Sequence, residues 1–233
     1  MNAIEVIFHG HSFFEIVLEQ GSILVDPYIT WNSQCDLILN DICKKNIIAI
    51  CITHGHKDHT WDTIAIKKID QNIPIYTVTW VAKYFTQCWL DMCIWWSIGG
   101  TLHHEYFSVK LVIAYHDWSI EETGLYTQPA WMIFKIWDTS IYHVWDSALT
   151  KDFELIWAYE KIDLLCIPIG WLYTMDIHDA VIACNMIKPR FVVPMHFDTF
   201  PAIRADAQEF ARRVMLDNYA VAKVLKAWQM IVL

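Results

Sequence analysis

Four of six consecutive residues have side chains that bind metal ions: His54, His56, Asp58 and His59. They form an H-x-H-x-D-H pattern shortly after the apolar run Ile47–Ile52. Imidazole nitrogens and carboxylate oxygens are ligands of zinc and similar divalent ions. Because a strand that ends in a loop can direct alternate side chains to one point, His54 and His56 can reach one ion, and Asp58 and His59 a second. The alternative, a polar loop that merely contains histidines, does not account for the further metal-type residues downstream.

Six more segments accompany this pattern in an order and spacing that are typical of one enzyme family. They are His9-Gly10-His11-Ser12, Asp26-Pro27, His116, Tyr142-His143-Val144-Trp145-Asp146, Pro168-Ile169-Gly170 with Tyr173-Thr174-Met175, and Pro194-Met195-His196-Phe197-Asp198-Thr199-Phe200-Pro201. With them the chain resembles the metallo-β-lactamase superfamily over nearly its whole length. It looks most similar to the small stand-alone metal-dependent hydrolases related to the ascorbate-phosphate lactonase branch.

The resemblance implies a site for two metal ions. Carried over residue by residue, the ligands of one ion are His54, His56 and His116, and those of the other are Asp58, His59 and His196. Asp146 matches the carboxylate that bridges both ions, because its two oxygens can bridge where a histidine could not. The ligand set favours zinc, and manganese, iron or nickel can also use it.

The implied function is that of a metal-dependent hydrolase. Two ions about 3.5–4 Å apart can share a water and lower its pKa from about 15.7 towards about 7, so hydroxide bound to both ions would attack an ester-like bond. Candidate substrates are a lactone, a thioester or a phosphodiester. Asp146, Asp58 and His11 are the candidate catalytic residues; Asp146 could orient the hydroxide and His11 could touch the substrate. A purely structural hydrogen-bonding role for His11 remains open.

The elements that must position these residues follow an α/β pattern, and no linker or repeat divides the chain, so we expect a single domain over residues 1–233. The predicted strands are Glu5–Phe8, Phe13–Leu18, Ser22–Val25, Ile47–Ile52, Pro74–Val78, Phe107–Tyr115, Trp131–Ile136, Ser140–Val144, Leu164–Ile167, Phe191–Val193, Ala222–Leu225 and Met230–Leu233. The predicted helices are Thr60–Ile69, Val81–Trp89, Asp176–Ile187 and Ala205–Leu216. Each proposed ligand then lies just past a strand end, where α/β folds gather side chains. The resemblance implies a four-layer αββα sandwich of two mixed sheets.

Other polar residues have competing interpretations. Asp26 is expected to accept a proton from the far nitrogen of a ligand histidine, although a turn or helix-cap role is an alternative. His143 is interpreted as a packed core residue. We expect His103, His104 and His178 at the surface.

Tryptophan occupies positions where the family pattern leads us to expect glycine. The chain has 13 tryptophans and 7 glycines, and the positions concerned are Trp31, Trp61, Trp118, Trp131, Trp145 and Trp171. Glycine serves where φ is positive or where the backbone approaches closely. Either the local backbone has adjusted and the indoles wall the pocket, or this is an altered or engineered family member with a damaged site. The alternative function is therefore a metal-binding scaffold with little catalytic activity.

Composition restricts the partners. The net charge of −9 and a pI of about 5.6 argue against a nucleic-acid surface, and so against a nuclease of the same superfamily. A small-molecule substrate is expected, and a homo-oligomer is compatible with the sequence. Neither a secretory signal nor 18 uninterrupted apolar residues is present, so no membrane association is expected. The seven cysteines contain no C-x-x-C pair, and Cys51 and Cys166 read as buried apolar residues, which favours a reducing cytoplasm.

Overall fold

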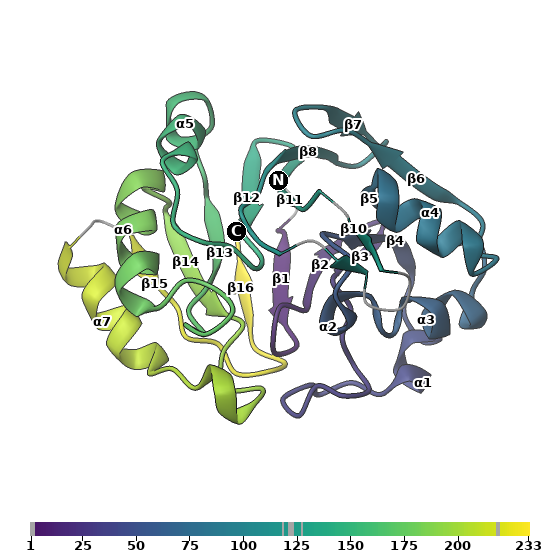
Figure 1. Cartoon of the computed structure of the whole chain (residues 1–233), viewed down its shortest axis with the longest axis horizontal. Helices are drawn as coiled ribbons and strands as arrows, with labels where there is room; N and C mark the ends of the chain where they lie inside the picture. The colour runs from purple at the N-terminus through teal and green to yellow at the C-terminus, as the bar shows by residue number, and fades with distance from the viewer. Residues whose placement is uncertain (1–2, 118, 121–123, 127, 218–219) are drawn as a thin grey trace. The chain divides into compact units, whose positions relative to one another are not determined.

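The computed structural model describes residues 3–117, 119–120, 124–126, 128–217 and 220–233, and Figure 1 labels its helices and strands. The chain divides into two compact units, each assembled from separated stretches. Unit 1 comprises Met1–Gly100, Asp117–Ala130 and Lys226–Leu233. Unit 2 comprises Thr101–His116 and Trp131–Leu225. Each unit has its own sheet and its own helices, so each is described separately.

Unit 1 contains a seven-stranded sheet in the order β16-β1-β2-β3-β4-β5-β6. Its strands are β1 (Glu5–Phe8), β2 (Phe14–Leu18), β3 (Gly21–Val25), β4 (Ile47–Ile52), β5 (Ile75–Val78), β6 (Cys93–Trp96) and β16 (Met230–Val232). The strands from β16 to β3 pair antiparallel, and those from β3 to β6 pair parallel. The predicted strand Ile47–Ile52 is confirmed, and its burial on both faces agrees with its unbroken apolar sequence.

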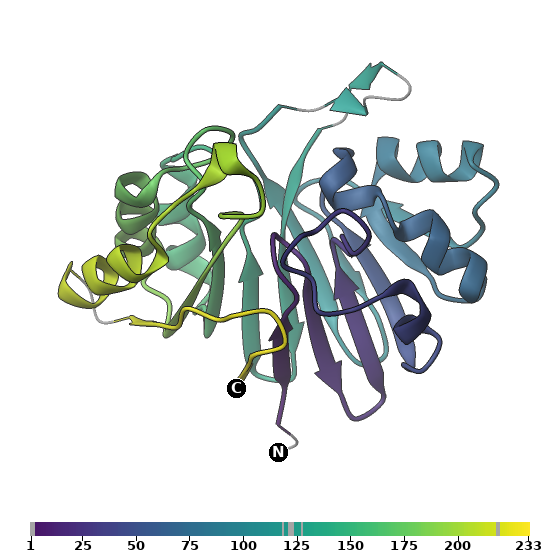
Figure 2. The same cartoon turned by 90° about the horizontal axis from the view of Figure 1, so that it is seen from below.

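The helices of unit 1 are α1 (Leu39–Ile42), α2 (Lys57–Thr60), α3 (Thr63–Ile69) and α4 (Thr79–Gln87). Figure 2 shows the last two along one face of the sheet. A two-stranded hairpin, β9 (Ser119–Ile120) with β10 (Leu125–Tyr126), completes the unit. Ile120 is buried directly over Gly55 of the loop from His54 to His56, where a Cβ on the glycine would lie 2.5 Å from Ile120 Cγ1. Only glycine therefore fits between His54 and His56.

The single helix predicted for Thr60–Ile69 is wrong, because two helices meet at Trp61 and Asp62. Asp62 is buried and uses its carboxylate elsewhere: the backbone N–H groups of Ile29 and Thr30 donate to it at 2.6 and 2.9 Å, and the Thr30 hydroxyl donates as well. These hydrogen bonds hold Asp62 against Ile29 and Thr30, and the helix is interrupted at this residue. Helical periodicity alone contains no information about such a contact.

Unit 2 contains a second seven-stranded sheet in the order β15-β14-β13-β12-β11-β8-β7. Its strands are β7 (Thr101–His103), β8 (Ser108–Ile113), β11 (Ala130–Ile136), β12 (Thr139–His143), β13 (Leu164–Pro168), β14 (Phe191–Met195) and β15 (Val221–Ala222). The strands from β12 to β15 are parallel, and β11 pairs antiparallel with β12. The strand predicted for Ala222–Leu225 is shifted towards the C-terminus, since β15 comprises only Val221–Ala222.

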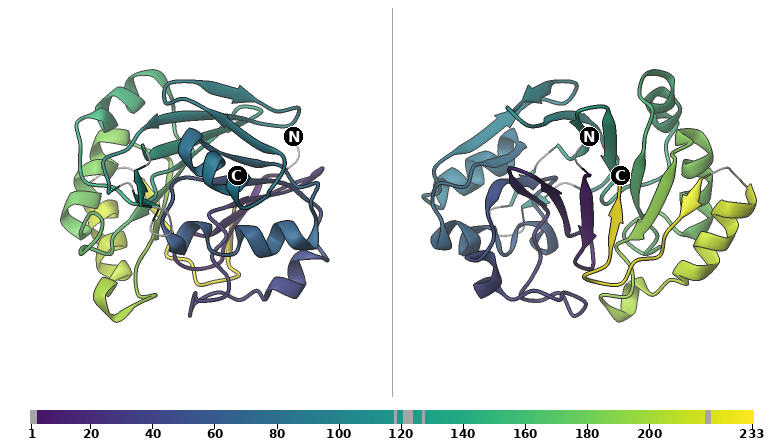
Figure 3. Two further views of the ribbon diagram at one scale, coloured as in Figure 1. Left: turned by 45° about the vertical axis from the view of Figure 1, so that its right-hand side comes forward. Right: turned by 180° about the vertical axis from the view of Figure 1, so that it is seen from behind.

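The helices of unit 2 are α5 (Asp152–Tyr159), α6 (Ile177–Ile187) and α7 (Ala207–Asp217), with the short 3₁₀ helix η1 (Pro201–Ile203) before α7. Figure 3 shows the three α-helices beside the strands β12 to β15. Helix α6 begins where the Asp176 carboxylate accepts the N–H of Asp179, an N-cap that its sequence predicts. In the core Trp131 stacks on Phe153 with ring centroids 4.7 Å apart, and His143 is buried as predicted.

Several short elements did not follow from periodicity, among them α1, α5, β6 and β7. Each has fewer than nine residues, and β7 is largely exposed, so no apolar repeat distinguishes it. Across the described residues, no helix has the length and apolar character needed to cross a membrane.

A cluster of buried charges holds the first hairpin of unit 1. Both ring nitrogens of His9 donate, Nδ1 to Asp36 at 2.7 Å and Nε2 to Glu15 at 3.0 Å. Lys45 Nζ donates to the same Glu15 oxygen at 2.8 Å. Burial alone would raise the pKa of Glu15, but the hydrogen bonds from His9, Lys45 and Ser22 lower it to about 2. Burial would lower the pKa of His9, and the bonds to Asp36 and Glu15 raise it above its ordinary value.

The cluster predicts acid-sensitive stability. Because the folded pKa of Glu15 lies below the unfolded value of 4.5, its contribution is complete above pH 4.5 and disappears as the pH falls towards 2. Urea unfolding should show Glu15→Gln less stable than wild type by about 2–3 kcal/mol at pH 6. The difference should shrink towards zero near pH 2. A difference that stays constant over this range would contradict the assignment.

A second prediction concerns the end of α4. The N–H of Trp89 donates to Thr86 O at 3.0 Å and that of Leu90 to Phe85 O at 3.1 Å, which is the Schellman pattern, and Trp89 has φ of 61°. This position favours glycine, and the indole is 93% exposed, so little packing is lost on removing it. Trp89→Gly should therefore raise the free energy of unfolding by about 1 kcal/mol.

The control is Trp95→Gly in β6, where the tryptophan is also exposed but φ is not positive. It should destabilise unit 1, because glycine weakens a strand. Equal effects of the two changes in thermal unfolding would contradict the strain argument.

Candidate metal centre

The loop after β4 brings its first two histidines together. His54 Nε2 and His56 Nδ1 lie 2.9 Å apart, and the ring centroids are separated by 4.5 Å. Two nitrogen ligands of one tetrahedral zinc ion lie about 3.3 Å apart, given bonds of about 2.0–2.1 Å. The pair therefore has nearly the spacing of two ligands on one ion. His56 also begins α2, where its carbonyl accepts the N–H groups of His59 and Thr60.

Asp26 fixes the other end of the same loop. It is fully buried at the end of β3, accepts the N–H and hydroxyl of Thr53 at 2.9 and 2.6 Å, and accepts Nδ1 of His59 at 2.8 Å. Because an ionised carboxylate only accepts, the proton of His59 lies on Nδ1, and Nε2 is the nitrogen suited to a metal. The hydrogen bond predicted for Asp26 toward a ligand histidine is thus present.

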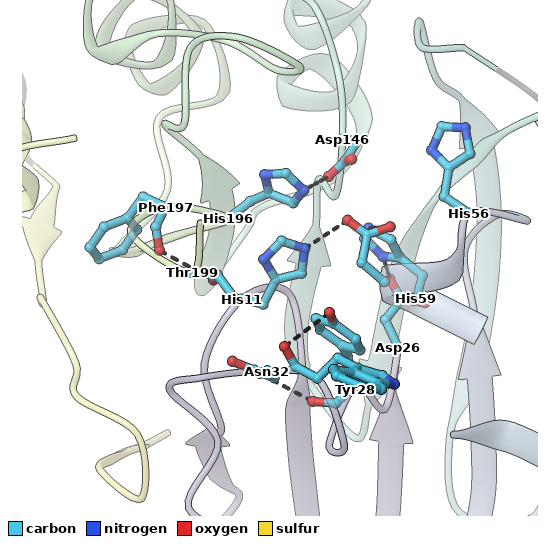
Figure 4. Close-up of polar contacts among 12 residues, drawn as sticks. His11, Asp26, Tyr28, Asn32, His56, His59, Asp146, His196, Phe197 and Thr199 are labelled. Carbon is cyan, nitrogen blue, oxygen red and sulfur yellow. Dashed lines mark hydrogen bonds and ion pairs between the residues drawn. The ribbon is translucent and has the colours of Figure 1, made fainter. Parts of the chain in front are cut away.

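His11 and Asp58 form a second close pair in unit 1. His11 Nε2 lies 3.0 Å from Asp58 Oδ2, and His59 Nε2 lies 4.0 Å from Asp58 Oδ1. Ligand atoms of His11, Asp58 and His59 all lie within 4.8 Å of one another. Figure 4 shows the His11 ring over the Tyr28 ring, and the two centroids are 5.4 Å apart. From the sequence, substrate contact and a structural hydrogen-bonding role were both open for His11. Its position among metal-type residues was not predicted, although a histidine could have suggested it.

In unit 2, Asp146 lies between two histidines. Its Oδ1 is 3.1 Å from His196 Nε2 and its Oδ2 is 3.5 Å from His116 Nε2; the first contact is drawn in Figure 4. The two oxygens thus contact different imidazoles. Asp146 and His196 are almost completely buried. A buried carboxylate needs such partners, because an unpaired buried charge is costly.

Strand ends position these three residues, as expected. His116 follows β8, Asp146 follows β12 and His196 follows β14. The N–H of Ala148 donates to Tyr115 O at 2.9 Å, which ties the segment after Asp146 to the segment before His116. His196 itself has φ of 54°, and a Cβ on Gly170 would lie 2.1 Å from its carbonyl oxygen. Gly170 is therefore required by close approach to His196.

The tryptophans named from the sequence differ in their surroundings. Of the tryptophans named in the sequence analysis that the structure describes, only Trp171 has a positive φ, 52°. The backbone argument for glycine therefore applies at Trp171 and not at Trp61 or Trp145. Trp145 is completely buried, with its ring edge-on to His116 at a centroid distance of 5.7 Å. Trp61 is partly exposed and meets Trp31 edge to face. Trp118 lies outside the described residues.

The donor set fits divalent metal ions. Within each unit, imidazole nitrogens and carboxylate oxygens lie 2.9 to 3.5 Å apart in pairs. Imidazole nitrogens and carboxylate oxygens are the atom types that such ions bind, and these distances are short enough for atoms of one pair to approach the same ion. The exposed His178 hydrogen-bonds to Arg213 and belongs to none of these pairs.

Comparisons with known proteins agree with this chemistry. A family model described as "Beta-lactamase superfamily domain" matches residues 5–196. A UPF0173 metal-dependent hydrolase from Bacillus cereus is 36% identical over 235 residues, which covers 98% of this chain and 100% of that protein. One from Anoxybacillus flavithermus is 35% identical over 215 residues, covering 90% and 93% of the two chains.

Among solved structures, Igni18, a metallo hydrolase from the archaeon Ignicoccus hospitalis, matches with a TM-score of 0.89 at 27% identity. The match covers 100% of this chain and 99% of that one. The predicted α/β fold, the αββα sandwich of two mixed sheets, is thereby confirmed. The chain belongs to the metallo-β-lactamase superfamily and is one of its metal-dependent hydrolases.

Proposed function

We propose that the chain acts as one domain that hydrolyses an ester-like bond at a centre for two divalent ions, with zinc as the preferred metal. His54, His56 and His116 would hold one ion, Asp58, His59 and His196 the other, and Asp146 both. Bound there, the two ions would supply hydroxide at neutral pH by lowering the pKa of a shared water. The substrate would be a small lactone, thioester or phosphodiester.

The observation that supports this proposal best is the position of Asp146. Its two carboxylate oxygens lie beside two different histidines, at 3.1 and 3.5 Å. Two oxygens with different neighbours are compatible with a carboxylate that bridges two ions. The close pair His54 and His56 supports the same interpretation in unit 1.

The remaining groups would act through position and charge. Asp146 would orient the attacking water. Its negatively charged carboxylate would lie close to the proton that this water loses. His11, 3.0 Å from Asp58, would hold that carboxylate in place and could also contact the substrate. Asp26 would keep His59 in the tautomer that offers Nε2. The acidic overall charge of −9 favours a small substrate over a nucleic acid.

The cellular location is part of the proposal. All seven cysteines are unpaired, and burial raises the pKa values of the thiols of Cys51, Cys166 and Cys184. Such thiols are chemically inert packing groups and suit a reducing compartment. We therefore place the protein in the cytoplasm.

Removing the bridging carboxylate tests the centre. Asp146→Ala should lower hydrolysis of any substrate by at least about 100-fold and reduce the bound metal below two ions per chain. His178→Ala is the control, since this exposed histidine should affect neither quantity. Metal content by elemental analysis, measured beside the activity on lactones, thioesters and phosphodiesters, gives both results. Equal losses in the two variants would show that the site is misplaced, and two bound ions without hydrolysis would support the scaffold alternative.

A further prediction concerns the residue that supports His59. Asp26→Asn should weaken the affinity for one metal ion by about 10–100-fold, because the amide no longer fixes the imidazole tautomer. Asp163→Asn is the matched control; that carboxylate accepts the N–H of Ser140 at 3.0 Å in unit 2 and touches no proposed ligand. Competition with a chelator measures both affinities. An unchanged affinity in Asp26→Asn would remove this residue from the account.

A further inference from the structure

We propose that the loop from Gly170 to Met175 in unit 2 binds an apolar, preferentially aromatic, group of the substrate. This inference rests on the proposed function, because it specifies the kind of molecule that the same site hydrolyses. Its evidence is separate: the attachment of the loop, its backbone conformation and the side chains that it exposes.

Both ends of the loop are attached beside proposed metal ligands of the same unit. At the start, a Cβ on Gly170 would lie 2.1 Å from the carbonyl oxygen of His196, so the backbones are in direct contact. At the end, the N–H of Met175 donates to the carbonyl of Ser147 at 2.9 Å, and Ser147 directly follows Asp146. Both ends of the loop are therefore held by residues at or next to two proposed ligands of unit 2, His196 and Asp146.

The loop is tightly turned and internally bonded. The N–H of Leu172 donates to Gly170 O at 2.7 Å, and the N–H of Trp171 donates to Met175 O at 3.1 Å. The first bond closes a γ-turn around Trp171, whose φ is 52°. A residue with a Cβ is strained in this conformation, and such strain is found where ligands are held. The turn is therefore a fixed platform on which side chains need little further ordering to bind.

Three consecutive apolar residues project from this platform into solvent. Trp171, Leu172 and Tyr173 are 52%, 47% and 57% exposed. Single exposed apolar residues are ordinary, but a contiguous group on a fixed turn indicates a binding surface. Two aromatic rings with one aliphatic side chain suit a flat apolar partner, since aromatic pairs gain from offset or edge-to-face contact. The chemistry points to an aromatic ring in the acyl group of the substrate.

A matched pair of variants tests the inference. Trp171→Gly removes the indole and keeps the backbone, because glycine accepts positive φ without strain. Trp137→Gly is the control: this tryptophan is 48% exposed, has φ of 50°, and lies at the opposite end of β12 from Asp146. Tyr173→Ala provides a second variant in case the first is poorly folded.

The substrates are the p-nitrophenyl esters of phenylacetate and acetate, which share a leaving group and differ in one ring. Wild type should prefer the phenylacetyl ester in kcat/KM, and Trp171→Gly and Tyr173→Ala should each reduce this ratio about tenfold, mainly through KM. Trp137→Gly should leave the ratio unchanged. A ratio that is the same in wild type, Trp171→Gly and Tyr173→Ala would overturn the inference.

A binding experiment separates this inference from the hydrolase proposal. Calorimetry with the metal-loaded protein should show tighter binding of phenylacetate than of acetate, and Trp171→Gly should lose this difference. If wild type cleaves neither ester but retains the Trp171-dependent preference, the loop assignment stands and ester hydrolysis is wrong. If Trp171 instead governs sedimentation with phosphatidylglycerol vesicles and not the ester ratio, the loop binds membranes and the substrate inference is overturned.

Discussion

Buried carboxylates that each serve more than one partner are the interactions on which the candidate site depends. In unit 1, Asp26 accepts hydrogen bonds both from Thr53, directly before the proposed ligand His54, and from His59. In unit 2, Asp146 lies between His116 and His196. A buried carboxylate is stable only if its partners remain in place. The fold is therefore constrained to keep these histidines oriented, and that orientation is what metal binding requires.

The sheets supply the rest of the geometry. Parallel strands end at one edge of a sheet, and His54, Asp146 and His196 follow the parallel strands β4, β12 and β14. His116 follows β8, which pairs antiparallel with β7. Close backbone approach then fixes the final positions: Gly55 leaves room for Ile120, and Gly170 for the carbonyl of His196. Four of the seven proposed ligands belong to unit 1 and three to unit 2.

Much of this architecture could be predicted from the sequence, because strong local signals coincide with the elements. The unbroken apolar run of β4 predicted a buried strand, and Asp176 predicted the start of α6. The H-x-H spacing also predicted that the side chains of His54 and His56 would approach one point, and they lie 2.9 Å apart. Two kinds of feature were inaccessible. The break between α2 and α3 depends on Asp62 reaching Ile29 and Thr30, a contact between remote segments. The place of His11 beside Asp58 depends on how loops 47 residues apart meet.

The tryptophans at positions where glycine is expected have different surroundings in the structure. Trp145 is a buried core residue against His116, whereas Trp171 is exposed on a strained turn. One side chain would thus support a proposed ligand by packing, and the other would contact a substrate.

Anomalous diffraction from crystals of the zinc-loaded protein, recorded at the zinc absorption edge, tests the central claim most directly. The account predicts two peaks about 3.5–4 Å apart, with one oxygen of Asp146 bonded to each ion. A single peak, or two peaks with Asp146 bonded to neither, would contradict it.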